Sequence, residues 1–261
     1  MSKVLAIVNQ KGGVGKTTTS VNLAASLKAT RLEVLLIDLD PQGNATMGSG
    51  VNKSDLELSV YDLLTENASF SDVVLHPEDA EYDLLPANGD LVAAEVELVN
   101  AEGREQRLRR IVDAVRAQYD FVVIDCPPSL TMLTVNALVA ADGVVIPMQC
   151  EYYALEGLSA LMDTIAAIKE RLNPNLRIEG ILRTMYDPRN KLTSEVNGQL
   201  FNYFGDTVYR TVVPRNVRLA EAPSYGKPVI TYDRQSRGAI AYLALAGEML
   251  RRYDEAERMS G

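Results

Sequence analysis

The chain has 261 residues, and its 47% hydrophobic and 23% charged content is that of a globular protein with a sizeable core, in one large α/β domain or two small ones. No apolar run approaches the roughly 18 to 20 residues that cross a bilayer, which argues against a membrane-spanning protein. The net charge of −9 would disfavour nucleic acid, but it is uneven: residues 171–237 hold 11 Lys/Arg and 6 Asp/Glu, whereas residues 54–101 hold 12 acidic residues and no Lys or Arg.

The first predicted elements are a strand, a glycine-rich turn and a helix. The apolar run 4–8 leads into Gln10-Lys11-Gly12-Gly13-Val14-Gly15-Lys16-Thr17-Thr18, and a helix is expected from Thr17 or Thr18 to about Ala29. In this context, backbone N–H groups and the helix N-terminus bind phosphate. The second half of the turn matches the template G-x-x-x-x-G-K-[ST], but Gln10 replaces its first glycine and an extra lysine, Lys11, has appeared.

Two further strands are predicted to end in carboxylates. The run 34–37 is followed by Asp38 and Asp40, and the run 121–124 is followed by Asp125. Open α/β sheets bind ligands at the carboxyl ends of their parallel strands. We therefore expect all three carboxylates beside the phosphate-binding turn.

The rest of the chain alternates between helical and strand patterns. Residues 45–100 are polar and irregular, with a short helix at 60–64 and a strand at 82–85. Helices are then expected at 108–115, 130–140, 155–172, 194–204 and 239–253, and strands at 144–148, 178–185 and 207–210. This order predicts an α/β fold, a single doubly wound, mostly parallel sheet with helices on both faces, in one domain spanning residues 1–261.

The residue types at the turn indicate nucleotide chemistry. The loop amides would hold the phosphates, and Lys16 would reach the β- and γ-phosphate oxygens. The Thr17 hydroxyl would bind Mg²⁺ with Asp125 nearby, and Asp38 is expected in the same magnesium shell. Asp40 lies one step further past its strand, so we expect it to orient or deprotonate the attacking water.

These motifs resemble a known family. The segment Lys11-Gly12-Gly13-Val14-Gly15-Lys16-Thr17 is similar to the deviant Walker A motif, x-K-G-G-x-G-K-[ST], of the MinD/ParA ATPases, a class of deviant P-loop NTPases. The segment Asp38-Leu39-Asp40-Pro41-Gln42-Gly43-Asn44 is similar to the second acidic motif of that family, and Val122-Val123-Ile124-Asp125-Cys126-Pro127-Pro128 to its Walker B strand. Pro214-Arg215-Asn216-Val217-Arg218-Leu219-Ala220-Glu221-Ala222-Pro223-Ser224 resembles a block of the ParA/Soj partition ATPases.

The resemblance implies an ATPase that acts as a nucleotide switch with ATP and Mg²⁺. In that family the extra lysine, here Lys11, crosses a dimer interface to the partner's phosphates, so that ATP drives homodimerisation. Catalytic roles then fall to Lys11, Lys16 and Asp40. Nucleotide contacts extend over residues 11–18, and the adenine is expected near Thr184, Met185 and Pro214.

Two macromolecular partners are implied as well. One is double-stranded DNA, bound without sequence preference by the ATP dimer, and the other is a ParB-type centromere-binding protein that stimulates hydrolysis. The basic excess late in the chain supports the first, with Arg189, Lys191, Arg215 and Arg218 in loop-like settings. The expected location is therefore cytoplasmic and nucleoid-associated. The early first strand leaves no room for a signal peptide, and Cys126 and Cys150 are expected to be buried and reduced.

Other functions would require features that the sequence can be searched for. A MinD-like membrane ATPase would need an amphipathic apolar and basic tail, but residues 251–261 are acidic and poor in large apolar groups. A reductase that bridges a metal cluster between two subunits would need glycine-rich surroundings around its cysteines, which Cys126 and Cys150 lack. A sequence-specific repressor would need a helix-turn-helix before the loop, where only nine residues precede Gln10. A metabolic ATP-dependent ligase stays open, and it predicts a small-molecule pocket and no DNA dependence.

Overall fold

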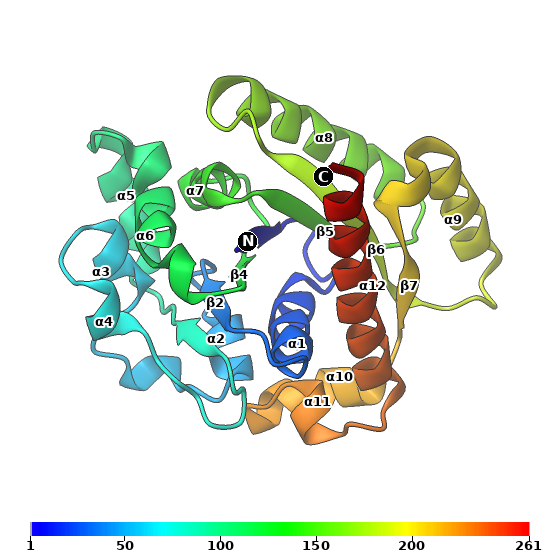
Figure 1. Ribbon diagram of the computed structural model, residues 1–261, viewed down its shortest axis with the longest axis horizontal. Helices are drawn as coiled ribbons and strands as arrows, with labels where there is room; N and C mark the ends of the chain where they lie inside the picture. The colour runs from blue at the N-terminus through cyan, green and yellow to red at the C-terminus, as the bar shows by residue number, and fades with distance from the viewer. Residues whose placement is uncertain (1, 261) are drawn as a thin grey trace.

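One parallel sheet forms the centre of the computed structural model, which describes residues 2–260 (Figure 1). Within this range seven strands are hydrogen-bonded in the order β3-β2-β4-β1-β5-β6-β7, and every pair is parallel. The strands are β1 (Lys3–Ile7), β2 (Val34–Asp38), β3 (Asp83–Leu85), β4 (Phe121–Asp125), β5 (Gly143–Gln149), β6 (Arg177–Tyr186) and β7 (Val208–Pro214). The predicted fold class is confirmed.

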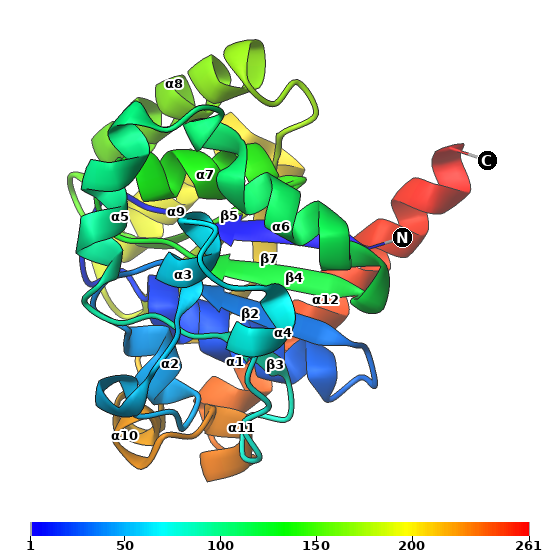
Figure 2. The same cartoon turned by 90° about the vertical axis from the view of Figure 1, so that its left-hand side faces the viewer.

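Helices cover both faces of the sheet, as Figures 1 and 2 show. The helices are α1 (Lys16–Lys28), α2 (Asn44–Gly48), α3 (Val60–Leu64), α4 (Phe70–Val73), α5 (Leu91–Glu97), α6 (Arg107–Val115), α7 (Met132–Ala140), α8 (Ala154–Arg171), α9 (Lys191–Phe204), α10 (Val217–Glu221), α11 (Val229–Tyr232) and α12 (Arg237–Ser260). Helices α5 to α9 lie on one face, and α1, α10, α11 and α12 lie on the other. No helix within residues 2–260 combines the length and the apolar character that a bilayer crossing needs.

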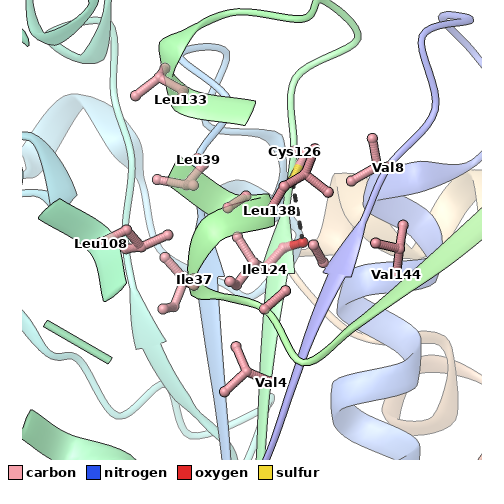
Figure 3. Packing of buried hydrophobic residues seen from close by; sticks show 14 of the residues in the cluster. Val4, Val8, Ile37, Leu39, Leu108, Ile124, Cys126, Leu133, Leu138 and Val144 are labelled. Carbon is pink, nitrogen blue, oxygen red and sulfur yellow. Dashed lines mark hydrogen bonds between the residues drawn. The ribbon is translucent and has the colours of Figure 1, made fainter. Parts of the chain in front are cut away.

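The central strands are apolar on both sides because each side meets a helical layer. Val4, Ile37 and Ile124, from three neighbouring strands, are buried on the face where Leu133 and Leu138 of α7 pack (Figure 3). The alternate residues of the same strands join a second buried cluster, with α1 and α12. One hydrophobic core therefore packs on each face of the sheet.

The topology creates a crevice at the carboxyl end of β1. The chain passes from β1 to β2 on one side, and later returns to β5 on the other side, so β1 lies between β4 and β5. Such a switch point opens a cleft for ligands at the strand ends. In register, Asp125 lies beside Ile7 of β1 and also beside Asp38 of β2. The sheet itself therefore brings both carboxylates to the phosphate-binding turn.

The main errors of the sequence prediction lie in the irregular parts. The last strand runs over Val208–Pro214, not 207–210, and short helices α2, α4, α5, α10 and α11 were not foreseen. Helices of four to seven residues carry too few turns to show a 3.6-residue period. The two cysteines are buried free thiols, as expected.

The β7 strand was read as too short because its middle is polar and lies at the sheet edge. Its backbone N–H groups at Arg210 and Thr211 donate to the carboxylate of Glu248 in α12, at 2.7 and 2.8 Å. The same carboxylate accepts from Arg252 at 2.7 Å. Burial alone would raise the pKa of Glu248, but these hydrogen bonds outweigh it and lower the pKa. A helix side chain thus takes the place of the missing neighbouring strand.

We expect Glu248→Ala to lower the free energy of unfolding by about 2–3 kcal/mol, because it leaves edge N–H groups and Arg252 without their acceptor. For a chain of this size that is a fall of roughly 4–12 °C in Tm. Glu255→Ala, at an exposed position of the same helix, is the matched control. Equal melting curves for both variants would contradict the role given to Glu248.

Candidate nucleotide site

The turn after β1 is held in a conformation that glycine makes possible. Gly13 and Gly15 have φ of +73° and +86°, in the left-handed region that side chains with a Cβ rarely adopt. Gly15 is the N-cap of α1, so its backbone leads directly into the helix N-terminus. Backbone N–H groups at such a helix N-terminus are the groups that bind phosphate. The loop thus has the shape that the motif predicts.

The two lysines of this loop point in different directions. Lys16 is buried, at 7% exposure, and its Nζ donates to the Lys11 carbonyl oxygen at 3.3 Å. Burial lowers the pKa of Lys16, and the nearby Asp125 carboxylate opposes the shift. The Lys11 side chain is half-exposed and forms an ion pair with Glu151, which follows β5. Only one of the two lysines therefore serves the cavity of its own chain.

A cavity of about 430 Å³ lies over the loop. It is lined by Gly12, Gly13, Gly15, Lys16, Thr17, Thr18, Asp40, Gln42, Asn44, Pro128 and Met185. Lys11, Asp38 and Asp125 do not line it. The predicted phosphate contacts are thus brought together around one space, apart from Lys11 and Val14, and the cavity is large enough for a triphosphate.

Asp125 does not line the cavity, and its carboxylate accepts hydrogen bonds from hydroxyl groups of α1. Its two oxygens accept from Thr17 Oγ1 at 2.8 Å and from Ser20 Oγ at 2.7 Å. Burial raises the pKa of Asp125, and the nearby Asp38 raises it further. Because the Thr17 hydroxyl donates its hydrogen bond to Asp125, the lone pairs of its oxygen remain available to a cation in the cavity.

Asp38 and Asp40 have different surroundings although they are two residues apart. Asp38 is fully buried and accepts from the Thr46 backbone N–H and hydroxyl, both at 2.8 Å. Burial raises the pKa of Asp38 despite these bonds. Asp40 lines the cavity and accepts from the Gln42 N–H at 2.9 Å through Oδ1. Its Oδ2 meets no hydrogen-bond donor in the described part of the chain, so that oxygen is available to a water.

The donor set fits a magnesium ion that is shared with phosphate. Magnesium prefers oxygen ligands. Here Thr17 offers a hydroxyl oxygen, and the neighbouring aspartates offer carboxylate oxygens. Across residues 2–260 no three His, Cys, Asp or Glu side chains are grouped so as to hold a metal by themselves. A site of this kind, with one hydroxyl and carboxylates set behind it, suits Mg²⁺ that takes its other ligands from phosphate and water.

The residues expected at the adenine lie in an adjoining cavity of about 180 Å³. Thr184, Met185 and Pro214 line it together with Gly15, Thr18, Val213, Arg215, Asn216, Leu219, Ala220 and Tyr242. Met185 also lines the phosphate cavity, and its φ of +47° is strained for a residue with a side chain. The Thr184 hydroxyl donates to the Val14 carbonyl at 2.7 Å, which ties this wall to the loop.

The four basic residues expected at DNA are all exposed, but two carry acidic partners. Arg189 forms two hydrogen bonds with Asp187, at 2.9 and 2.8 Å. Arg218 pairs with Glu221 and Asp233, at 2.8 and 3.2 Å. Lys191 and Arg215 form no ion pair within the described range.

The expectation that all four occupy loop-like settings is wrong for two of them. Lys191 begins α9, and Arg218 lies in the five-residue helix α10. Neither helix start could be read from periodicity, because α9 begins with polar residues and α10 is barely more than one turn.

Several residues at the site escaped the sequence reading. Gln42, Asn44 and Pro128 line the phosphate cavity although only their motifs were noted. Thr46 and Glu151 were missed altogether. Glu151 follows a parallel strand, which is a weak signal of its own, whereas Thr46 is recognisable only from its contact with Asp38.

Comparisons with known proteins show which chains this one is similar to. A family model described as an AAA domain matches residues 2–178. The chain is 55% identical to the sporulation initiation inhibitor protein Soj of Bacillus subtilis, over 95% of this chain and 98% of that protein. It is 50% identical to the chromosome partitioning protein ParA of Myxococcus xanthus, over 97% and 89% of the two chains. A cobyrinic acid a,c-diamide synthase from Mycobacterium smegmatis, solved with ADP and magnesium, has a TM-score of 0.86 at 36% identity, over 98% and 97%.

Proposed function

The chain belongs to the ParA/Soj family of partitioning ATPases, and we propose that it is an ATP-dependent dimer switch that holds DNA while ATP is bound. Residues 1–261 form a single ATPase domain in this proposal. Two subunits close over two ATP molecules, the dimer binds double-stranded DNA without sequence preference, and hydrolysis releases it. A ParB-type partner accelerates that hydrolysis. The expected place of action is the nucleoid, in the cytoplasm.

The main support for this proposal is that the side chains of the two loop lysines point in different directions. Lys16 is buried in its own phosphate cavity, whereas the Lys11 ammonium is directed to the surface and does not line that cavity. A second cation on a phosphate loop that does not reach its own phosphates is available to those of another subunit. Placed across an interface, it is favourable only when a triphosphate is present there. This supports a dimer whose stability depends on ATP.

Each residue of the cavity then has a defined task. The loop N–H groups and Lys16 would hold the β- and γ-phosphates, and the Thr17 hydroxyl, oriented by Asp125, would ligate the metal. When bound, Mg²⁺ neutralises charge on the β- and γ-phosphate oxygens. Asp40, with one oxygen fixed by the Gln42 N–H, orients the attacking water through the other. Asp38 accepts from the Thr46 hydroxyl and from the Asp40 N–H, and thereby positions the turn that carries Asp40. It lies beside Asp125 in the sheet and would belong with it to the outer shell of the metal.

Light scattering with ATP and with ADP tests the switch. We expect a monomer near 28.6 kDa with ADP and a particle of twice that mass with ATP. A monomer under both conditions would contradict the proposal.

The DNA surface is proposed at Arg189, Lys191, Arg215 and Arg218. Arg189 and Arg218 each have an acidic partner, and this strengthens the expected loss of DNA binding when either arginine is substituted. Without the guanidinium, the partner carboxylate would face the DNA phosphates and repel them. Hydrogen bonds from Arg189 lower the pKa of Asp187 to about 2, so this carboxylate is ionised at neutral pH. Dimerisation doubles the surface and couples DNA affinity to ATP.

We expect the double variant Arg189→Ala, Arg218→Ala to lose ATP-dependent DNA retention while dimerisation is unchanged. Four cations disappear per dimer, so the slope of log affinity against log salt should flatten by up to about four. Asp187→Asn should have the opposite effect and tighten retention several-fold. Substitution of Arg110 and Lys169, exposed on α6 and α8, is the control for charge alone. If retention survives the double variant, DNA binds elsewhere.

A metabolic ligase is the second candidate, and the likeness to the cobyrinic acid synthase favours it. The partitioning relatives are more similar, at 50–55% identity against 36%. A ligase would consume ATP without any dependence on DNA. The membrane alternative has less support, because the described end of α12 exposes Glu255, Glu257 and Arg258 where a membrane-binding helix would carry apolar groups.

A further inference from the structure

The ion pair between Lys11 and Glu151 leads beyond the proposed dimer, on which this inference rests. We propose that Glu151 is a positioning residue that holds the Lys11 ammonium on its own subunit until a partner's triphosphate displaces it. Glu151 thereby sets the threshold at which ATP dimerises the protein.

The loop segment before Lys11 is already fixed to β5, so the side chain alone has to move. The Asn9 side chain donates to the Pro147 carbonyl at 2.8 Å and accepts from the Lys11 N–H at 2.9 Å. The Lys11 carbonyl in turn accepts from Lys16. With its backbone held at two points, Lys11 can exchange ligands only through rotation of its four-carbon side chain.

Glu151 is placed to meet that side chain but not the phosphates of its own chain. It lies between β5 and α8, and its N–H and carbonyl are both engaged, with Gln149 and Ala154. Its carboxylate does not line the phosphate cavity. Both partners of the ion pair are about half exposed, at 48% and 44% of their side chains. Such a pair is weak, and a triphosphate with several negative charges competes with it effectively.

The strength of the pair decides what it does. A buried, tight pair would keep Lys11 from ever reaching a partner, whereas a half-exposed one sets only a modest threshold. Each dimer breaks two such pairs, so the restraint acts twice on the dimerisation equilibrium. On this account Glu151 disfavours dimers in the absence of ATP without preventing them in its presence.

The test measures the dimer dissociation constant by analytical ultracentrifugation with ATPγS, a slowly hydrolysed analogue. We expect Glu151→Gln to tighten the dimer by between about two- and thirtyfold, from two surface ion pairs. Glu151→Asp keeps the negative charge and should leave the dimer dissociation constant at the wild-type value. Glu156→Gln, an exposed position in the first turn of α8, makes the same charge change without touching Lys11.

The outcomes separate this role from the dimer itself. If Glu151→Gln leaves the constant unchanged, weakens the dimer, or acts no differently from Glu156→Gln, the role of Glu151 is overturned while the proposed function stands. If the wild type forms no dimer with ATPγS, the proposed function fails, and the role of Glu151 fails with it. If Glu151→Gln tightened the dimer of a Lys11→Ala variant, compared with Lys11→Ala alone, the role would also be overturned. In that background no Lys11 ammonium remains to be released.

Discussion

Asp40→Ala is expected to slow ATP hydrolysis by about 10²- to 10⁴-fold while ATP binding is retained. The side chain lines the phosphate cavity, and one of its oxygens is free to accept from a water. The phosphates are held by the loop and Lys16, which the substitution does not touch. The protein should therefore accumulate as an ATP dimer, visible in light scattering as a species that persists for the duration of the experiment.

Two companion variants make the result specific. Asp40→Asn keeps the shape and the hydrogen bond from Gln42 but removes the negative charge, and it should also be slow. Asp55→Asn alters an exposed carboxylate outside the cavity and should hydrolyse ATP normally. Retained turnover in Asp40→Ala would assign the water to another group.

Lys11→Ala is expected to abolish the ATP dimer and leave ATP binding to the monomer within about threefold of the wild type. Each subunit would lose one charge-assisted contact across the interface. Two such contacts are worth about 3–6 kcal/mol, or roughly a hundred- to ten-thousandfold in the dimer dissociation constant. Binding to the monomer is spared because Lys11 does not line the cavity of its own chain.

The measurement is titration of a fluorescent ATP analogue followed by sedimentation of the same samples. Lys169→Ala removes an exposed lysine of α8 and serves as the matched control. A normal ATP-dependent dimer of Lys11→Ala would contradict the role of the extra lysine. Loss of nucleotide binding would instead mean that Lys11 acts within its own chain.

The sequence predicts the site well where residues near the strand ends follow a motif. Asp38 and Asp125 end paired strands, so sheet register alone brings them together. The glycines of the loop predict its left-handed turns. These features are local, or they follow from a parallel sheet once it is recognised.

What escaped prediction depends on contacts between distant segments. Glu248 completes the edge of β7 from a helix 37 residues further along the chain, and Glu151 meets Lys11 across 140 residues. The ion pair of Lys11 with Glu151 was not predicted, because Glu151 carries no sequence signature. The different surroundings of Asp38 and Asp40 likewise depend on Thr46, which the motif does not identify.

One measurement tests the central claim most directly: retention of the protein on arbitrary double-stranded DNA with ATP, with ADP and without nucleotide, at a fixed salt concentration. The account predicts retention with ATP alone, and its loss when ADP replaces ATP. Equal retention in all three conditions, or none in any of them, would contradict a switch in which ATP controls the hold on DNA.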